Sequence, residues 1–223
     1  MWFGDLRVPD GVFVTLEGGE GAGKSTQIAR LAESLRSLGK DVIVTREPGG
    51  SVGAEEIRQL LVKGDNGRWD PLSETLLLYA ARRDHCMRVI EPALAAGKFV
   101  LSDRFADSTM AYQGYGLGLE RETIRRLHRL ILDGFEPDLT LILDLPVMTG
   151  LERSLARLEK DGQDAEDRYE NMDVEFHERM RQGFIEIAAG DPKRCKLIDA
   201  NQQSNAVSEV IWDLVCGRFE LAL

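Results

Sequence analysis

The chain has 223 residues, of which 43% are hydrophobic, and this length can bury the core of one large domain. Its formal net charge of -10 argues against general binding to nucleic acid or to an anionic membrane. Three scattered cysteines without a C-x-x-C pair indicate neither a zinc site nor a disulfide framework and are typical of a reducing compartment. No apolar run has membrane-spanning length and residues 1–11 lack signal-peptide features, so we expect a cytoplasmic protein.

Short apolar, β-branched runs alternate with stretches of helical periodicity along the chain. The runs that predict strands are residues 12–16, 42–45, 99–102, 139–143 and 196–198. The stretches that predict helices run from the first loop to Gly39 and then cover about 53–62, 72–96, 120–133, 149–159, 173–189 and 205–217. The polar stretch 160–168 is expected to be a surface loop. This alternation predicts an α/β fold, a parallel sheet with helices on both faces, in a single domain over residues 12–223 that follows an N-terminal tail of residues 1–11.

The first predicted strand is followed by a glycine-rich segment, residues 18–25, that reads G-x-x-x-x-G-K-[ST]. Between a strand and a helix, such a segment is a phosphate-binding loop, because its backbone N–H groups and the positive end of the helix face an anion. Lys24 adds a charge for the outer phosphates, and the Ser25 hydroxyl is the expected Mg²⁺ ligand. The residues expected to hold the nucleoside triphosphate are Gly18, Gly19, Glu20, Gly21, Ala22, Gly23, Lys24, Ser25 and Thr26.

A phosphate-binding loop suits either a nucleotide-hydrolysing regulatory protein or an enzyme that transfers the terminal phosphoryl group. The D-x-x-G and N-K-x-D segments of a GTPase do not occur in the sequence. Arg46 and Arg104 instead follow the second and third predicted strands, where both should project beside the loop and neutralise a transferred group. Asp103 ends the third strand, the position of an acid that holds Mg²⁺ directly or through water. We therefore favour phosphoryl transfer, and hydrolysis without an acceptor stays the alternative.

Several segments together are similar to those of the bacterial thymidylate kinase family, from about residue 12 to the end of the chain. They are residues 17–27 (EGGEGAGKSTQ), 45–50 (TREPGG), 103–105 (DRF), 108–109 (ST), 111–114 (AYQG), 137–140 (PDLT) and 143–144 (LD). The resemblance implies a three-layer α/β/α P-loop kinase fold with a five-stranded parallel sheet and a helical lid at about residues 149–171. It also implies phosphorylation of dTMP to dTDP with ATP and Mg²⁺, a step in dTTP synthesis for DNA replication, by a homodimer. A kinase for another acceptor, such as dUMP or UMP, stays open.

Further roles follow from this resemblance position by position. Glu20 resembles the loop acid that contacts the sugar 3′-hydroxyl and the metal region. Arg46 and Arg104 resemble the arginines that hold the acceptor phosphate, and Arg82 resembles the arginine that reaches the base. The other residues expected around the thymine and the sugar are Phe105, Thr109, Tyr112 and Gln113.

One position around the base departs from the usual pattern of the family. Leu78 stands where a phenylalanine usually stacks on thymine. Leucine covers a base face by dispersion but lacks the ring quadrupole. Either Leu78 covers the base less well, or Tyr79 or Phe105 contributes.

The lid is expected to supply cations, because Gly21 stands where one branch of the family has an arginine. Arg168 and Arg157 are expected to contact the ATP phosphates when the lid closes. The resulting catalytic set is Lys24, Arg104, Arg157, Arg168 and Glu20. A phosphate oxygen is already a nucleophile at neutral pH, so none of the histidines, His85, His128 and His177, is expected to act as a base.

Overall fold

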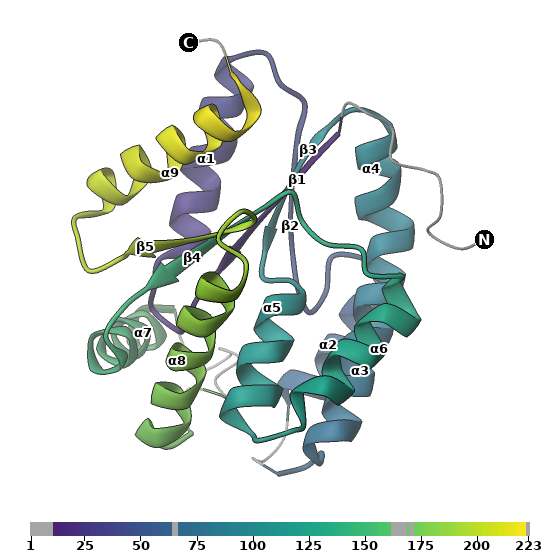
Figure 1. Cartoon of the computed structure of the whole chain (residues 1–223). Helices are drawn as coiled ribbons and strands as arrows, with labels where there is room; N and C mark the ends of the chain where they lie inside the picture. Colours follow the sequence, from purple (N-terminus) through teal and green to yellow (C-terminus); the bar gives the residue numbers. More distant parts are fainter. Residues whose placement is uncertain (1–10, 64–66, 162–168, 170–171, 222–223) are drawn as a thin grey trace.

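A computed structural model of the chain describes residues 11–63, 67–161, 169 and 172–221, with the backbone alone described for residues 157–161. Within these residues, five parallel strands form one sheet in the order β2-β3-β1-β4-β5 (Figure 1). The strands are β1 Val12–Glu17, β2 Val42–Arg46, β3 Phe99–Asp103, β4 Leu139–Asp144 and β5 Cys195–Asp199. The predicted five-stranded parallel sheet is confirmed, and each strand exceeds its predicted range by one residue at one or both ends.

Helices cover both faces of the sheet and give the expected three layers (Figure 1). They are α1 Lys24–Ser37, α2 Val52–Val62, α3 Pro71–His85, α4 Glu91–Ala95, α5 Ala106–Thr109, α6 Arg121–Leu132, α7 Val147–Asp161, α8 Val174–Gly190 and α9 Ser204–Phe219. The first and last of these helices pack on one face of the sheet, and α3, α4, α6 and α8 pack on the other. The two faces therefore carry separate parts of the core.

The strands are apolar on both faces because both faces are covered. Along β1, Val14 and Leu16 point into the core beside α1 and α9, whereas Phe13 points into the core beside α3 and α6. The register pairs Leu16 with Asp103 and Arg46 with Asp103. The carboxyl ends of β1, β2 and β3 therefore end level with one another, which gathers the polar residues that follow them.

Two helical regions differ from the prediction. The stretch at 72–96 consists of α3, a π-helical turn at Cys86–Ile90 and α4. A further helical region, α5 with its π-helical continuation Met110–Gly116, is absent from the prediction. Its serine, threonine and glycine residues have low intrinsic helix propensity, and burial against α8 compensates for it.

Several helix ends agree with the sequence signals. Asp70 caps α3 by accepting hydrogen bonds from the backbone of Leu72 at 2.9 Å and Ser73 at 3.1 Å, with Pro71 at the first helical position. Gly39 follows α1 with φ 75°, as expected for a C-terminal glycine.

The predicted polar loop at 160–168 begins later than expected, because α7 continues to Asp161, and residues 162–168 lie outside the described residues. The N-terminal tail, the single domain and the lid boundaries stay predictions. In the part of the chain that the structure describes, no helix has both the length and the apolar character needed to cross a membrane.

Candidate active site

A cleft of about 660 Å³ opens at the carboxyl edge of the sheet, beside the phosphate-binding loop. Its walls come from this loop, the ends of β2 and β3, and helices α2, α3, α5 and α7. Every residue predicted for the acceptor site lines it, although these residues are spread over 94 positions of the sequence. They are Glu20, Arg46, Leu78, Arg82, Arg104, Phe105, Thr109, Tyr112 and Gln113. Loop residues 21–26 and Asp103 line the same cleft.

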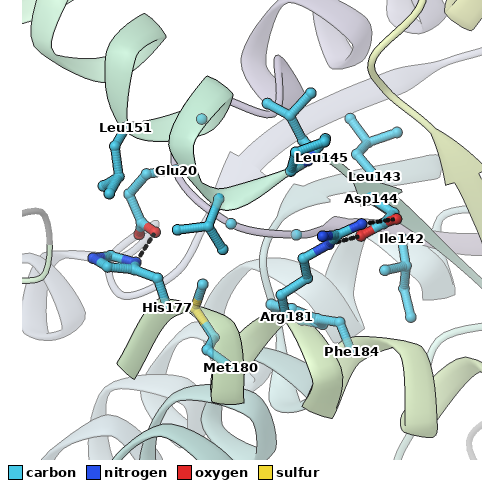
Figure 2. Close-up of a pocket in the computed structure, with 15 residues that line it drawn as sticks. Glu20, Ile142, Leu143, Asp144, Leu145, Leu151, His177, Met180, Arg181 and Phe184 are labelled. Atoms are coloured by element: carbon cyan, nitrogen blue, oxygen red, sulfur yellow. Dashed lines mark hydrogen bonds and ion pairs between the residues drawn. The ribbon is translucent and has the colours of Figure 1, made fainter. Parts of the chain in front are cut away.

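A second, smaller cavity lies behind the loop, between β4 and α8 (Figure 2). Its volume of about 20 Å³ has room for one water molecule, so it cannot hold a nucleotide. Arg181 spans this region and donates to both carboxylate oxygens of Asp144, at 2.7 and 3.0 Å, which ties α8 to the end of β4 (Figure 2). We therefore place the functional site in the large cleft and regard the small cavity as a support of the loop.

The phosphate-binding loop connects β1 to α1 as the sequence predicts. Lys24 reaches back over the loop and donates to the carbonyl oxygens of Gly18 at 3.0 Å and Gly19 at 2.8 Å. Burial is the largest influence on its ammonium group, and the nearby Arg104 adds repulsion, so that the pKa of Lys24 falls to about 8. An anion at the loop would add to the counter-charge that Asp103, Glu20 and Glu17 already supply.

The two predicted metal ligands lie together. The Ser25 hydroxyl donates to Oδ2 of Asp103 at 2.9 Å, across the gap between α1 and the end of β3. The residues that the structure describes hold no cluster of three or more His, Cys, Asp or Glu side chains suited to a metal. A hydroxyl and a carboxylate therefore fit an ion that takes its remaining ligands from phosphates and water, as Mg²⁺ does in nucleotide sites.

Arg104 has an unusual backbone and a crowded side chain. Its φ is 73°, in the left-handed region that a non-glycine residue rarely adopts. The guanidinium donates to the Gly18 carbonyl at 2.9 Å and to the Ser108 hydroxyl at 3.2 Å, and it lies over the Tyr112 ring at 4.8 Å. The left-handed turn thus aims the arginine back at the phosphate-binding loop instead of away from it.

The loop acid Glu20 is held by three partners. Tyr112 Oη donates to Glu20 Oε1 at 2.5 Å, Arg104 Nη2 lies 3.3 Å from the same oxygen, and His177 Nδ1 lies 3.6 Å from Oε2 (Figure 2). Burial alone would raise the pKa of Glu20, but His177, Arg104 and Lys24 outweigh it and lower the pKa to about 2. The carboxylate therefore stays charged, and its neighbours offset its repulsion of a bound phosphate.

Arg46 is the last residue of β2 and is half-exposed in the cleft. It pairs with Glu55 of α2 at 3.0 Å. Two further cations line the cleft: Arg58, which is absent from the prediction, donates to the Pro48 carbonyl at 2.5 Å, and Arg153 of α7 donates to the Ala200 carbonyl at 3.3 Å. Burial and the nearby Arg46 lower the pKa of Arg58 to about 10. A sequence signal for Arg58 exists, since it is the only basic residue of α2.

The far wall of the cleft carries two buried polar atoms without partners in the described part of the chain, Nη1 of Arg82 and Oε1 of Gln113. The other side-chain nitrogens of Arg82 and Gln113 have hydrogen-bond partners. Gln113 Nε2 donates to Glu74 at 2.7 Å and to the Tyr169 hydroxyl at 2.9 Å, and Arg82 Nη2 donates to Thr109 at 3.0 Å. Buried polar groups are rarely left unpaired, so a free donor and a free acceptor in one cleft indicate a ligand with the complementary edge.

The structure separates the three residues considered for the base face. Leu78 and Phe105 both line the cleft. Tyr79 does not: it is 1% exposed, its ring packs against His128, and its hydroxyl points to the Ile124 carbonyl at 3.5 Å. The suggestion that Tyr79 covers the base is therefore wrong, because it lies on the core-facing side of α3.

The side chains of the predicted lid cations are not among those that the structure describes. Arg168 lies outside the described residues, and for Arg157 only the helical backbone of α7 is described. Tyr169, within the predicted lid, lines the cleft: its ring meets Tyr112 edge-on at 5.0 Å and its hydroxyl contacts Gln113. The roles of Arg157 and Arg168 stay predictions.

The chain is similar to known proteins over most of its length. A sequence model described as thymidylate kinase matches residues 16–211. A thymidylate kinase of Caulobacter vibrioides is 56% identical over 211 residues, which cover 95% of this chain and 99% of that protein. A thymidylate kinase of Geobacter sulfurreducens is 47% identical and covers 93% of this chain and 98% of its own length. A crystal structure of thymidylate kinase from Ehrlichia chaffeensis aligns with a TM-score of 0.74 at 37% identity, over 93% of this chain and 99% of that one.

The contact between Gly21 and Gly150 yields a prediction about stability. A Cβ at Gly21, where φ is 65°, would lie 2.1 Å from the Gly150 carbonyl oxygen, so the loop and α7 could not stay in contact. Gly21→Ala should lower the free energy of unfolding by about 3 kcal/mol or more, judging by the cost of overpacking added to that of the left-handed backbone. Gly39→Ala is the matched control, because φ is 75° there and a Cβ would meet nothing within 4 Å.

The control substitution should cost about 1 kcal/mol, the backbone penalty alone. Urea denaturation of both variants measures the difference. Equal losses for the two substitutions would show that the close approach of the loop to α7 does not exist in solution.

Proposed function

The chain belongs to the thymidylate kinase family, and we propose that its large cleft binds ATP and dTMP end to end and transfers the γ-phosphoryl group to give ADP and dTDP. This reaction is a step towards dTTP for DNA replication. One observation carries the proposal: a phosphate-binding loop, two strand-end arginines and an unpartnered donor–acceptor pair line a single cleft. The loop matches the donor nucleotide, the two arginines match the acceptor phosphate, and the donor–acceptor pair matches the acceptor base.

The donor end is the phosphate-binding loop, residues 18–26. Its backbone N–H groups and Lys24 bind the β- and γ-phosphates, and the N-terminal end of α1 adds its dipole. Ser25 and Asp103 would hold Mg²⁺, directly or through water. When bound, the metal neutralises charge on the phosphates during transfer.

The acceptor phosphate is held by Arg46 and Arg104. An arginine presents a planar pair of donors that matches phosphate oxygens, so two of them fix the acceptor in line with the loop. The attacking phosphate oxygen needs no general base. Arg58 and Arg153 add positive charge to the walls, which favours a transition state whose charge lies on the transferred oxygens.

The acceptor base is read by Arg82 and Gln113. A thymine or uracil edge presents a carbonyl oxygen beside a ring N–H, which fits a free guanidinium nitrogen beside a free amide oxygen. Cytosine would place an amino group against the guanidinium and leave both protein groups unpaired. Leu78 lines the cleft as apolar surface for the base, the buried Phe105 ring supports it from beneath the Arg82 guanidinium, and the Tyr112–Glu20 pair lies where the sugar is expected.

The homodimer and the cytoplasmic location stay predictions. The three cysteines are free thiols, two of them buried, which agrees with a reducing compartment. The assignment of each side chain above is likewise a proposal, supported by the shared cleft and by the unpartnered atoms.

The acceptor is identified by ADP release with a panel of nucleoside monophosphates. We expect dTMP to give the highest kcat/KM and dUMP a value lower by about tenfold to a hundredfold, since one methyl group in an apolar pocket contributes about 1–3 kcal/mol. For dCMP and AMP, kcat/KM should fall on the order of 10⁴-fold, because the polar pair is left unsatisfied. ADP release at the same rate without any acceptor would instead support the hydrolytic alternative.

Arg104→Ala should lower kcat on the order of a hundredfold to a thousandfold, the effect of removing one group that stabilises charge in the transition state. Steady-state kinetics with saturating ATP and dTMP provide the measurement. Arg125→Ala is the matched control, because Arg125 lies on α6, pairs with Glu122 at 3.5 Å and is half-exposed away from the cleft. Near-normal turnover of the Arg104 variant would remove this residue from the site.

Lys24 predicts a pH dependence of ATP binding. Its pKa in the free protein is about 8, and bound phosphates should raise it. ATP therefore binds the protein in which Lys24 is charged. The affinity for ATP should be highest below pH 8 and should fall by up to about tenfold per pH unit above it. Calorimetry between pH 7 and pH 9.5 measures both the affinity and the proton taken up.

Lys24→Arg is the control for this pH profile, since a guanidinium keeps its charge throughout this range. Its affinity for ATP should not vary with pH above 8 in the same way. A profile identical to that of the unsubstituted protein would assign the titration to another group.

A further inference from the structure

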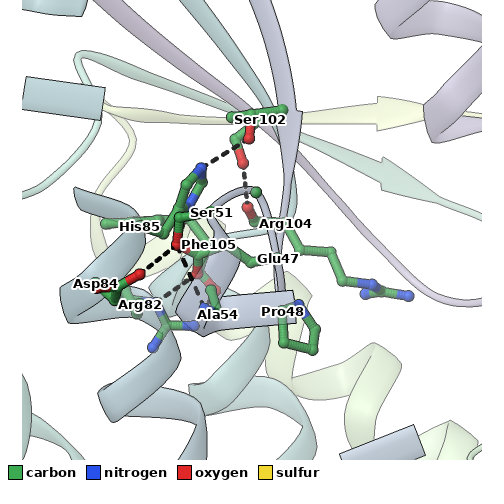
Figure 3. A network of polar contacts seen from close by, with 12 residues as sticks. Glu47, Pro48, Ser51, Ala54, Arg82, Asp84, His85, Ser102, Arg104 and Phe105 are labelled. Carbon is green, nitrogen blue, oxygen red and sulfur yellow. Dashed lines mark hydrogen bonds and ion pairs between the residues drawn. The ribbon is translucent and has the colours of Figure 1, made fainter. Parts of the chain in front are cut away.

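The guanidinium of Arg82 is fixed on two sides by buried partners (Figure 3). Its Nε donates to Oε2 of Glu47 at 2.6 Å, and its Nη2 donates to the Phe105 carbonyl at 3.1 Å and to the Thr109 hydroxyl at 3.0 Å. Only 2% of the Arg82 side chain is exposed. These bonds set the plane of the guanidinium and leave Nη1 as its one nitrogen without a partner among the described residues.

Glu47 is in turn held by His85, which is fully buried (Figure 3). Nδ1 of His85 lies 2.9 Å from Oε1 of Glu47, and Nε2 lies 2.7 Å from Oγ1 of Thr45. A carboxylate only accepts hydrogen bonds, so Nδ1 carries the hydrogen and donates it to Glu47. The four side chains form a line from Thr45 at the end of β2 through His85 and Glu47 to Arg82.

The glycine that ends the R-E-P-G-G segment makes room for this line of contacts. A Cβ at Gly50 would lie 2.4 Å from Nε2 of His85 and 2.5 Å from Oγ1 of Thr45. Any side chain there would displace the histidine from Thr45 and tilt its Nδ1 away from Glu47. This close approach explains a motif residue for which the proposed reaction gives no role.

We propose that His85 is a positioning residue for the acceptor base: it fixes Glu47, which fixes the guanidinium of Arg82 that meets the base. The inference rests on the proposed function and deepens it. A carboxylate bonded at both oxygens cannot rotate, so the Arg82 plane is set before the acceptor arrives. Without the histidine, Glu47 keeps one partner and can turn, and Arg82 then loses part of its orientation. His85 touches neither substrate nor reacting atoms.

The two amide substitutions of His85 separate positioning from packing. The amide nitrogen of asparagine reaches the position of Nδ1, whereas that of glutamine reaches the position of Nε2. His85→Asn keeps the donor to Glu47 and should leave the dTMP dissociation constant within about twofold, whereas His85→Gln should raise it about tenfold, which corresponds to about 1.4 kcal/mol. The dissociation constant of ATP should stay unchanged in both variants. Calorimetry with each nucleotide alone measures these values.

Ser51→Ala is the control for general destabilisation. The Ser51 hydroxyl donates to Asp84 at 2.7 Å in the same region, but its bond does not lead to Arg82 (Figure 3). This variant should lower the melting temperature and leave dTMP binding unchanged. If Ser51→Ala weakened dTMP binding as much as His85→Gln, or if both His85 variants bound dTMP normally, the inference would be overturned.

A double-mutant cycle with Arg82→Gln tests whether His85 acts through Arg82. In that background His85→Gln should weaken dTMP binding no further, because the group it positions is gone. Additive losses would overturn the inference. Absence of dTMP-dependent ADP release in the unsubstituted protein would overturn the proposed function and this inference with it. If the unsubstituted protein turns over dTMP and both His85 variants bind dTMP normally, only the inference is overturned.

Discussion

The left-handed turn at Arg104 is the constraint on which the rest of the site depends. Three hydrogen bonds hold it: Arg104 N donates to the Leu16 carbonyl at 3.0 Å, the Ser102 hydroxyl donates to the Arg104 carbonyl at 2.8 Å, and Phe105 N donates to Glu17 at 2.7 Å. A left-handed backbone costs a non-glycine residue about 1–2 kcal/mol, and each hydrogen bond contributes about 1 kcal/mol. The three hydrogen bonds offset the cost of the left-handed backbone, and they form because β1 and β3 are paired in this register. Burial and Asp107 raise the pKa of Glu17 to about 8, which fits its enclosed position beneath the turn.

An acidic protein concentrates positive charge where it handles anions. Six basic and three acidic side chains line the cleft, although the whole chain has a formal net charge of -10. They are Lys24, Arg46, Arg58, Arg82, Arg104 and Arg153 with Glu20, Glu47 and Asp103. The three carboxylates repel an anion in the cleft less than free carboxylates would, because each is bonded to a basic or hydroxyl group. Each carboxylate also orients its partner. The result is a locally positive field with fixed directions, while the remaining surface repels other polyanions.

Much of the fold and the two strand-end arginines follow from local signals in the sequence, whereas the other acceptor-site residues follow from the resemblance to the family. Strands were identified because apolar runs alternate with glycine-ended helices, and the strand ends placed Arg46 and Arg104 at one edge. The supporting residues could not be identified in this way. His85 and Glu47 are 38 positions apart and His177 and Glu20 are 157 apart, and no periodicity marks either pair. The sequence does not exclude Tyr79 from the base, because the helical phase of α3 decides which of two neighbouring residues faces the cleft, and this phase depends on tertiary packing.

The close approach of two glycines fixes the helix that carries Arg153 and Arg157. Gly21 and Gly150 are mutually close, since a Cβ at Gly150 would lie 2.6 Å from the Glu20 carbonyl oxygen. This contact leaves no room for a side chain at position 21 and anchors the first turn of α7 against the loop. Arg153 follows one turn later and lines the cleft. Arg157 is four residues further, a rise of about 6 Å along the same helical face. A helix fixed at Gly150 thus carries its basic residues away from the loop in steps of about one turn, so that Arg153 begins nearest to the loop.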